Sequence, residues 1–250
     1  MNSKLYGLIG YPLGHSFSVP FFEKKFKAEG IDAEYRNFPL EEINEFETLL
    51  KVEPDLSGLN VTVPYKQLII PYLDALSKTA RAIQAVNTVL FCRRDGRLAL
   101  IGHNTDVGGF RKSLEEHLKK QHRSALVLGS GGSSKAVIHV LETLEIEFKL
   151  ISRSRGEDRL SYEQVDADLV AQTPLLINTT PLGMFPDVES SPAIPYEAIH
   201  KDHLLFDLVY NPERTQFLKK GEERGAAVVN GYDMLVYQAE ASWEIWNKES

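Results

Sequence analysis

A glycine-rich turn between a short apolar strand and a helix restricts the fold of this chain more than any other feature. Residues 125–128 have the pattern of a strand, Gly129-Ser130-Gly131-Gly132 follows directly, and residues 133–144 have helical spacing. Glycines at such a turn let backbone N–H groups approach a pyrophosphate that faces the helix N-terminus. The strand, turn and helix supply the context that a dinucleotide fingerprint requires. The sequence therefore predicts a dinucleotide site at Gly129, Ser130, Gly131, Gly132 and Ser133.

The end of the next strand indicates which dinucleotide binds. Enzymes that use NAD place an acid there for the ribose 2′-hydroxyl, whereas enzymes that use NADP place arginine for the 2′-phosphate. This chain has Ile151-Ser152-Arg153-Ser154-Arg155 at that point, with no acid before Glu157. Guanidinium and hydroxyl groups are suitable donors for a phosphate, so Ser152, Arg153, Ser154 and Arg155 are predicted to bind NADP. The alternative is a solvated basic loop.

Strand and helix patterns continue through the rest of the sequence. Residues 106–234 alternate strands with helices, which is typical of a mainly parallel, doubly wound sheet. Strands are expected there at 125–128, 148–151, 175–177, 204–209 and 227–229, with a long helix at 106–119. The first part is mixed α/β. Its strands are expected at 5–9, 33–38, 59–63, 86–92 and 97–101, and its helices at 17–28 and 41–51, with a last helix of the chain at 234–246.

These patterns predict the fold class α/β, in two domains with a cleft between them. The 250 residues are enough for two separate cores. We expect residues 1–105, completed by a C-terminal helix at 235–250, to form the first domain. Residues 106–234 are expected to form a Rossmann-like domain that binds NADP.

Charge and composition argue against several classes of function. Lysine and arginine total 28 against 35 acidic residues, without the basic excess of a general nucleic-acid-binding protein. No apolar run approaches the roughly 20 residues of a membrane span, and the start of the sequence lacks the pattern of a signal peptide. His200 and His203 lack further ligand candidates, which favours a solvated pair over a metal site. Cys92 is the one cysteine, so no disulfide can form within the chain, which suits a reducing compartment. We expect a cytoplasmic protein that acts on a small molecule, as a monomer or a homodimer.

A series of short motifs runs along the whole sequence. The first part contains Gly14-His15-Ser16-Phe17-Ser18, Asn60-Val61-Thr62-Val63-Pro64-Tyr65-Lys66, Ala85-Val86-Asn87-Thr88 and Asn104-Thr105-Asp106. The second part contains Asn178-Thr179-Thr180-Pro181-Leu182-Gly183-Met184, Asp207-Leu208-Val209-Tyr210-Asn211-Pro212, Asn230-Gly231-Tyr232-Asp233-Met234-Leu235 and Gln238-Ala239. In this order and spacing, the motifs closely resemble the shikimate dehydrogenase family over nearly the whole chain.

The resemblance implies an NADPH-dependent, reversible reduction of 3-dehydroshikimate to shikimate, in the biosynthesis of chorismate and the aromatic amino acids. It implies that Leu208 and Gly231 flank the nicotinamide ring. It also implies that the first domain binds the substrate, and that Ser16 and Ser18 bind the substrate carboxylate. The full set of substrate-binding residues implied by motif position is Ser16, Ser18, Thr62, Lys66, Asn87, Asp106, Tyr210 and Gln238.

Lys66 and Asp106 are the predicted catalytic residues. An ammonium near a ketone oxygen stabilises a developing alkoxide and can protonate it, and a neighbouring carboxylate favours the charged amine. We assign the acid role to Lys66. Asp106 is assigned chiefly to binding a substrate hydroxyl and orienting Lys66, with proton transfer as the weaker alternative. Considered without these motifs, Lys66 would more simply be interpreted as a surface lysine, and Asp106 as a helix N-cap.

The sequence departs from the family pattern at a few positions. The family usually has Ser-Pro after its second serine and a His-Asn pair soon afterwards, where this chain has Val19-Pro20 and Phe21-Phe22-Glu23. Ser134 takes the third glycine position of the fingerprint, Ser152 stands where asparagine is frequent, and Gln84 stands where glycine is common. None of these departures removes a proposed catalytic group.

Two other functions stay open on the sequence. One is a paralogue that oxidises shikimate or quinate with NAD, against which the basic loop at Arg153 argues. The other is a catalytically silent protein that binds a nucleotide or a small acid, against which the retention of Lys66 and Asp106 argues.

Overall fold

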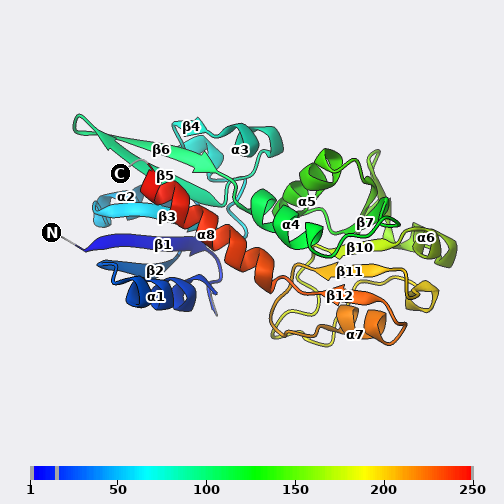
Figure 1. The fold of residues 1–250 in the computed structure, drawn as a ribbon. Helices are drawn as coiled ribbons and strands as arrows, with labels where there is room; N and C mark the ends of the chain where they lie inside the picture. Colours follow the sequence, from blue (N-terminus) through cyan, green and yellow to red (C-terminus); the bar gives the residue numbers. More distant parts are fainter. Residues whose placement is uncertain (1–2, 15–16, 249–250) are drawn as a thin grey trace. The chain divides into compact units, whose positions relative to one another are not determined.

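The computed structural model describes residues 3–14 and 17–248, and the chain forms two compact units (Figure 1). Unit 1 comprises Met1–Asp106 and Gln238–Ser250, and unit 2 comprises Val107–Tyr237. The chain leaves unit 1 at the first residue of helix α4 (Asp106–Glu115) and returns within helix α8 (Tyr232–Lys248). Among the described residues, no helix is long and apolar enough to cross a membrane.

Unit 1 contains a six-stranded mixed sheet in the order β2-β1-β3-β5-β6-β4. Strand β1 is parallel to β2 and β3, while β5 is antiparallel to β3 and β6. The β5–β6 hairpin turns at Asp95 and Gly96, whose φ angles of 52° and 73° suit a tight turn between twisted strands. The strands are β1 (Lys4–Gly10), β2 (Ala33–Pro39), β3 (Leu56–Val61), β4 (Ala75–Leu76), β5 (Thr88–Arg94) and β6 (Arg97–His103).

Helices cover both faces of this sheet. Because side chains alternate along a strand, Tyr6 of β1 packs with α1 (Ser18–Glu29) and α8 in an aromatic core that includes Trp246. Ile9 of the same strand packs on the opposite face, with Phe46 of α2 (Glu45–Val52) and Ala80 of α3 (Lys78–Ile83). Strand β1 therefore contributes side chains to two hydrophobic cores, one on each face of the sheet.

Unit 2 contains a six-stranded, fully parallel sheet in the order β12-β11-β10-β7-β8-β9. Helices α4 and α5 (Gly132–Thr143) pack on one face, and α6 (Ala167–Gln172) and α7 (Gln216–Glu222) on the other. The strand order reverses between β7 and β10, and ligands of such sheets bind beyond the carboxyl ends of the strands at this point. The predicted doubly wound α/β fold is confirmed. The strands are β7 (Ser124–Leu128), β8 (Glu147–Ser152), β9 (Arg159–Ser161), β10 (Leu175–Asn178), β11 (Leu204–Asp207) and β12 (Ala227–Val229).

Several predicted boundaries differ from the structure. The helix expected at 106–119 ends at Glu115, because the chain then turns, with the N–H groups of His117 and Leu118 both donating to Leu114 O. The strand expected at 59–63 spans 56–61, and Pro64, which lacks an N–H, lies beyond it. Gln84 takes a left-handed φ of 52° after α3, a conformation that favours glycine. Helices α3, α6 and α7 and strands β4 and β9 are too short to produce a clear periodic pattern.

Two histidines are buried in unit 2, His122 at 3% exposed and His203 at 1%. His122 Nδ1 accepts from Lys119 N at 3.0 Å, and His203 Nε2 lies 2.9 Å from Val170 O. Burial lowers the pKa of both imidazoles. The interpretation of His200 and His203 as a solvated pair is therefore wrong for His203. In the described ranges, no group of three or more His, Cys, Asp or Glu residues could hold a metal ion.

Unit 2 is expected to lose stability in mild acid because of His122 and His203. Each pKa is lower in the folded chain than its unfolded value of about 6.5. The contribution is complete above the unfolded pKa and is lost as the pH falls from there toward the folded pKa. The loss is at most about 1.4 kcal/mol per pH unit for each histidine.

Urea unfolding between pH 5 and 7.5 measures this effect. His122→Asn keeps an acceptor for the Lys119 N–H but cannot be protonated, so its unfolding free energy should fall less steeply in acid than that of the wild type. The same change at His117, which is exposed, serves as the control. Parallel curves for the wild type and His122→Asn would contradict the prediction.

Candidate active site

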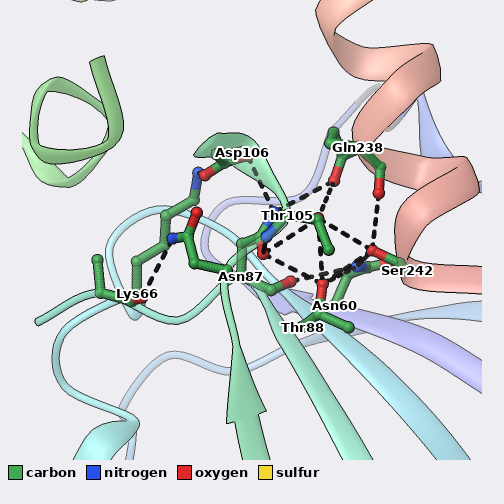
Figure 2. A network of polar contacts seen from close by, with 10 residues as sticks. Asn60, Lys66, Asn87, Thr88, Thr105, Asp106, Gln238 and Ser242 are labelled. Carbon is green, nitrogen blue, oxygen red and sulfur yellow. Dashed lines mark hydrogen bonds and ion pairs between the residues drawn. The ribbon is translucent and has the colours of Figure 1, made fainter. Parts of the chain in front are cut away.

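An ion pair between Lys66 and Asp106 lies within a polar network of unit 1 (Figure 2). Lys66 Nζ donates to Asp106 Oδ2 at 2.7 Å, and the two side chains are only 13% and 8% exposed. Lys66 lies in the turn after β3, where its carbonyl accepts from Val86 N at 2.7 Å. Asp106 is the first residue of α4, and two residues, Asn104 and Thr105, connect it to the end of β6. The fold thus pairs two charges that are forty residues apart in the sequence.

Asn87, just before β5, holds the second carboxylate oxygen of Asp106. Its Nδ2 donates to Asp106 Oδ1 and Thr105 Oγ1, both at 2.9 Å, and to Gln238 Oε1 at 3.3 Å. Its Oδ1 accepts from Thr105 N at 2.7 Å and from Thr88 Oγ1 at 3.1 Å. Because both ends of the amide are engaged, the orientation of Asn87 is fixed, and with it the position of Asp106.

Four further residues complete the network, and none was among the predicted site residues: Asn60, Thr88, Thr105 and Ser242. Asn60 Nδ2 donates to Ser242 Oγ at 3.0 Å, and Ser242 Oγ lies 2.8 Å from Thr88 Oγ1 and 3.2 Å from Thr105 Oγ1. Three of these residues lie within the quoted motifs. Ser242 had one signal, its spacing of four from Gln238, which places both on one helix face.

The altered segment after Ser18 packs against this network. Phe22 stacks on Tyr35 with ring centroids 4.5 Å apart, and the Tyr35 hydroxyl donates to Asn60 Oδ1 at 2.8 Å. Burial raises the pKa of Tyr35, opposed by a side-chain hydrogen bond with Ser18. The phenol therefore stays protonated and remains a donor to Asn60. The departure from the family pattern supplies an aromatic support for the site.

The other predicted substrate residues lie in both units. Ser18 is buried as the first residue of α1, Thr62 is half-buried directly after β3, and Gln238 is buried in α8. Tyr210 belongs to unit 2, in the loop after β11, and is half-buried. Ser16 lies outside the described residues. Within unit 1, the structure brings Lys66, Asn87, Asp106 and Gln238 into one network and links Ser18 to it through Tyr35.

The glycine loop of unit 2 connects β7 to α5. Gly129 has a φ of 110°, and a Cβ there would lie 2.7 Å from Thr179 Oγ1, so only glycine fits. Gly131 precedes the first turn of α5 in an extended conformation, and a Cβ there would meet nothing within 4 Å. Ser130 is exposed, and Gly132 and Ser133 begin the helix. The open space before this helix N-terminus fits the pyrophosphate of a dinucleotide.

The basic loop follows β8. Ser152 is buried and its hydroxyl donates to Ser154 O at 2.5 Å, which shapes the turn. Arg153, Ser154 and Arg155 are exposed. The two guanidinium groups make no ion pair with any residue that the structure describes. They are thus available as donors for a phosphate at the carboxyl edge of the parallel sheet.

Leu208 and Gly231, the residues assigned to the nicotinamide, are in contact within unit 2. Leu208 N donates to Asn178 O at 2.9 Å, and Gly231 N donates to Val209 O at 3.2 Å. A Cβ at Gly231 would lie 2.2 Å from Leu208 O. Glycine is therefore required at this close approach of two backbone segments.

Comparison with known proteins shows which family this chain resembles. Residues 8–89 match the shikimate dehydrogenase substrate binding domain. A shikimate dehydrogenase (NADP(+)) of Methanococcus maripaludis is 38% identical over an alignment 261 residues long, gaps included. The alignment covers 98% of this chain and 92% of the relative. The crystal structure of shikimate 5-dehydrogenase from Thermus thermophilus in complex with NADP(H) and shikimate has a TM-score of 0.85 at 28% identity, covering 98% of this chain and 93% of the other.

A second solved structure bears on the choice of cofactor. Quinate dehydrogenase from Corynebacterium glutamicum in complex with NAD has a TM-score of 0.85 at 29% identity, and the match covers 98% of this chain and 94% of the other. The fold is therefore shared by relatives with either dinucleotide. The identity to the Methanococcus maripaludis relative over nearly the whole length shows that the chain belongs to the shikimate dehydrogenase family.

Proposed function

We propose that this chain catalyses the NADPH-dependent, reversible reduction of 3-dehydroshikimate to shikimate, a step toward chorismate and the aromatic amino acids. The observation that carries the proposal is the buried Lys66–Asp106 ion pair, 2.7 Å long, in a member of this family. A buried pair of charges is costly to desolvate, and a purely structural role does not require its oriented network. This argues against a catalytically silent binding protein.

Lys66 supplies the proton in the proposed reaction. NADPH, when bound, supplies the hydride that reaches the ketone carbon, while the carbonyl oxygen takes a proton. The ammonium of Lys66 has three N–H donors, and the ion pair with Asp106 engages one of them. Another can bond the ketone oxygen, stabilise the negative charge that develops on it, and transfer the proton.

Asp106, Asn87 and Gln238 orient the substrate. Each carboxylate oxygen of Asp106 accepts one bond, from Lys66 or from Asn87, and retains a lone pair for a substrate hydroxyl. Ser16 and Ser18 are proposed to bind the carboxylate, and Thr62 and Tyr210 to line the rest of the substrate site. Unit 1 is proposed as the substrate-binding unit and unit 2 as the NADP-binding unit. The cytoplasmic location and the monomeric or homodimeric state remain predictions.

Turnover assays test the proposal directly. Absorbance of the reduced nicotinamide should fall when the protein is mixed with NADPH and 3-dehydroshikimate, and should rise with NADP and shikimate. The same assays with NAD, and with quinate, test the alternative function. Absence of turnover with 3-dehydroshikimate and either cofactor would overturn the proposal.

The preference for NADP is expected to depend on Arg153. Replacing Arg153 with alanine should weaken NADPH binding by roughly 1.5–3 kcal/mol, the scale of a lost charged hydrogen bond, and should leave NADH binding unchanged. Titration calorimetry with both cofactors measures this difference. Arg224→Ala, at another exposed arginine of unit 2, is the matched control. Equal binding of NADH and NADPH by the wild type would contradict the assignment of this loop.

A further inference from the structure

A ladder of buried and half-buried polar side chains joins the carboxyl ends of three neighbouring strands in unit 2. Thr179, after β10, donates through its hydroxyl to Leu128 O at 2.9 Å and Gly129 O at 3.1 Å, at the end of β7. Asn178, the last residue of β10, donates through Nδ2 to Asp207 Oδ1 at 2.9 Å, at the end of β11. The ladder therefore begins at the glycine loop and ends at Asp207.

Asp207 is a fully buried carboxylate that receives three hydrogen bonds. Its donors are the Thr215 hydroxyl at 2.6 Å, Asn178 Nδ2 at 2.9 Å and Val209 N at 3.0 Å. Burial raises the pKa of Asp207 to about 7, opposed by these same bonds. A buried carboxyl group is costly for stability, so its presence calls for a reason other than packing.

The contacts of Asp207 fix the backbone at the proposed nicotinamide site. Through Val209 N it holds the residue that follows Leu208, and the Val209 carbonyl in turn accepts from Gly231 N at 3.2 Å. Through Asn178 it holds the next loop, because Asn178 Oδ1 accepts from Thr180 N at 3.0 Å. Since Gly231 already lies against Leu208 O, a shift at Asp207 must move both backbone segments.

We propose that Asp207 is a positioning residue for hydride transfer, which sets the backbone of Leu208 and Gly231 through Asn178, Val209 and Thr215. This proposal rests on the proposed function. Asp207 itself has no exposed surface and acts through its neighbours. It fixes where the reactive half of the cofactor lies, while the glycine loop and the basic loop bind the other half.

Asp207→Asn tests the proposal with little change in shape. The amide oxygen can still accept from Val209 N and Asn178 Nδ2. The amide nitrogen cannot accept from the Thr215 hydroxyl, which itself already accepts from Leu218 N. The bond to Thr215 is therefore lost or reversed, and the loop after β11 must shift. We expect kcat to fall roughly 10- to 100-fold, the scale of a small misplacement of reacting groups. The affinity for adenosine 2′,5′-bisphosphate, which lacks the nicotinamide, should stay within about twofold of the wild type. The kinetic isotope effect with 4-deuterated NADPH should increase, because hydride transfer becomes slower relative to other steps.

Two further variants separate positioning from a purely structural role. Asp202→Asn makes the same change at an exposed aspartate just before β11, and should keep the wild-type kcat. Thr215→Val should lower kcat as Asp207→Asn does, and Thr215→Ser, which keeps the hydroxyl, should restore most of it.

The outcomes of these measurements are distinct. A kcat of Asp207→Asn within twofold of the wild type would overturn the positioning role. So would a parallel loss of kcat, Tm and adenosine 2′,5′-bisphosphate affinity, since that pattern indicates a structural residue. If the wild type does not reduce 3-dehydroshikimate, the proposed function fails first, and the fluorescence of bound NADPH still tests whether Asp207→Asn alters the nicotinamide environment.

Discussion

Lys66→Met is expected to lower kcat by roughly 10²- to 10³-fold, the effect of removing a donor to a developing oxyanion, while the Kd for NADPH stays unchanged. Methionine keeps the unbranched side chain and removes the charge and the proton. The ion pair with Asp106 is only 13% and 8% exposed, so the charge removed belongs to a site from which water is largely excluded. Steady-state kinetics and NADPH titration measure the two quantities. Near-normal turnover would exclude Lys66 as the acid.

A second variant distinguishes lost chemistry from lost stability. Lys66→Met leaves Asp106 as an uncompensated buried charge, which costs roughly 3–5 kcal/mol in comparable pairs. The double variant Lys66→Met/Asp106→Asn removes that charge, so its Tm should recover while its kcat does not. Recovery of kcat together with Tm would show that Lys66 acts on the fold and not on the reaction.

Gly131→Ala is expected to weaken NADPH binding by roughly 10- to 100-fold, which corresponds to about 1–3 kcal/mol. The added methyl group would occupy space that the bound pyrophosphate needs, and overpacking of this kind has costs on that scale. In the free protein, a Cβ at Gly131 meets nothing within 4 Å and its φ of −80° is ordinary. The Tm should therefore stay the same or rise slightly, because alanine reduces the freedom of the unfolded chain. Calorimetric titration with NADPH and thermal unfolding without it measure both effects.

Gly129→Ala provides the contrast. Its φ of 110° and the 2.7 Å approach to Thr179 Oγ1 mean that alanine there strains the free protein, so both Tm and NADPH affinity should fall. If Gly131→Ala bound NADPH as tightly as the wild type does, the pyrophosphate would not lie before α5. That result would remove the loop from the cofactor site without affecting the fold assignment.

Much of the fold follows from local pattern. Unit 2 was predictable because each of its main strands is a short apolar run, and the glycine loop marks where strand β7 passes into α5. Helices α3, α6 and α7 and strands β4 and β9 were not predictable, since they are short and have neither a complete helical period nor a clear apolar run. The extent of α4 was overestimated because Leu118 continues the apolar spacing although the helix has ended.

The same distinction holds for the site: its motifs are local in the sequence, whereas its hydrogen bonds join residues that are far apart in the sequence. The candidate residues of the site were predictable from their motifs: Lys66, Asn87 and Asp106, the glycine loop, and the two arginines after β8. Their hydrogen-bond partners became known only with the fold, as the bonds of Ser242 with Asn60 and of Asp207 with Thr215 show. A buried polar group must be paired, and its partner can come from any part of the chain that packs beside it. That partner is set by sheet order and helix packing, which no local pattern encodes.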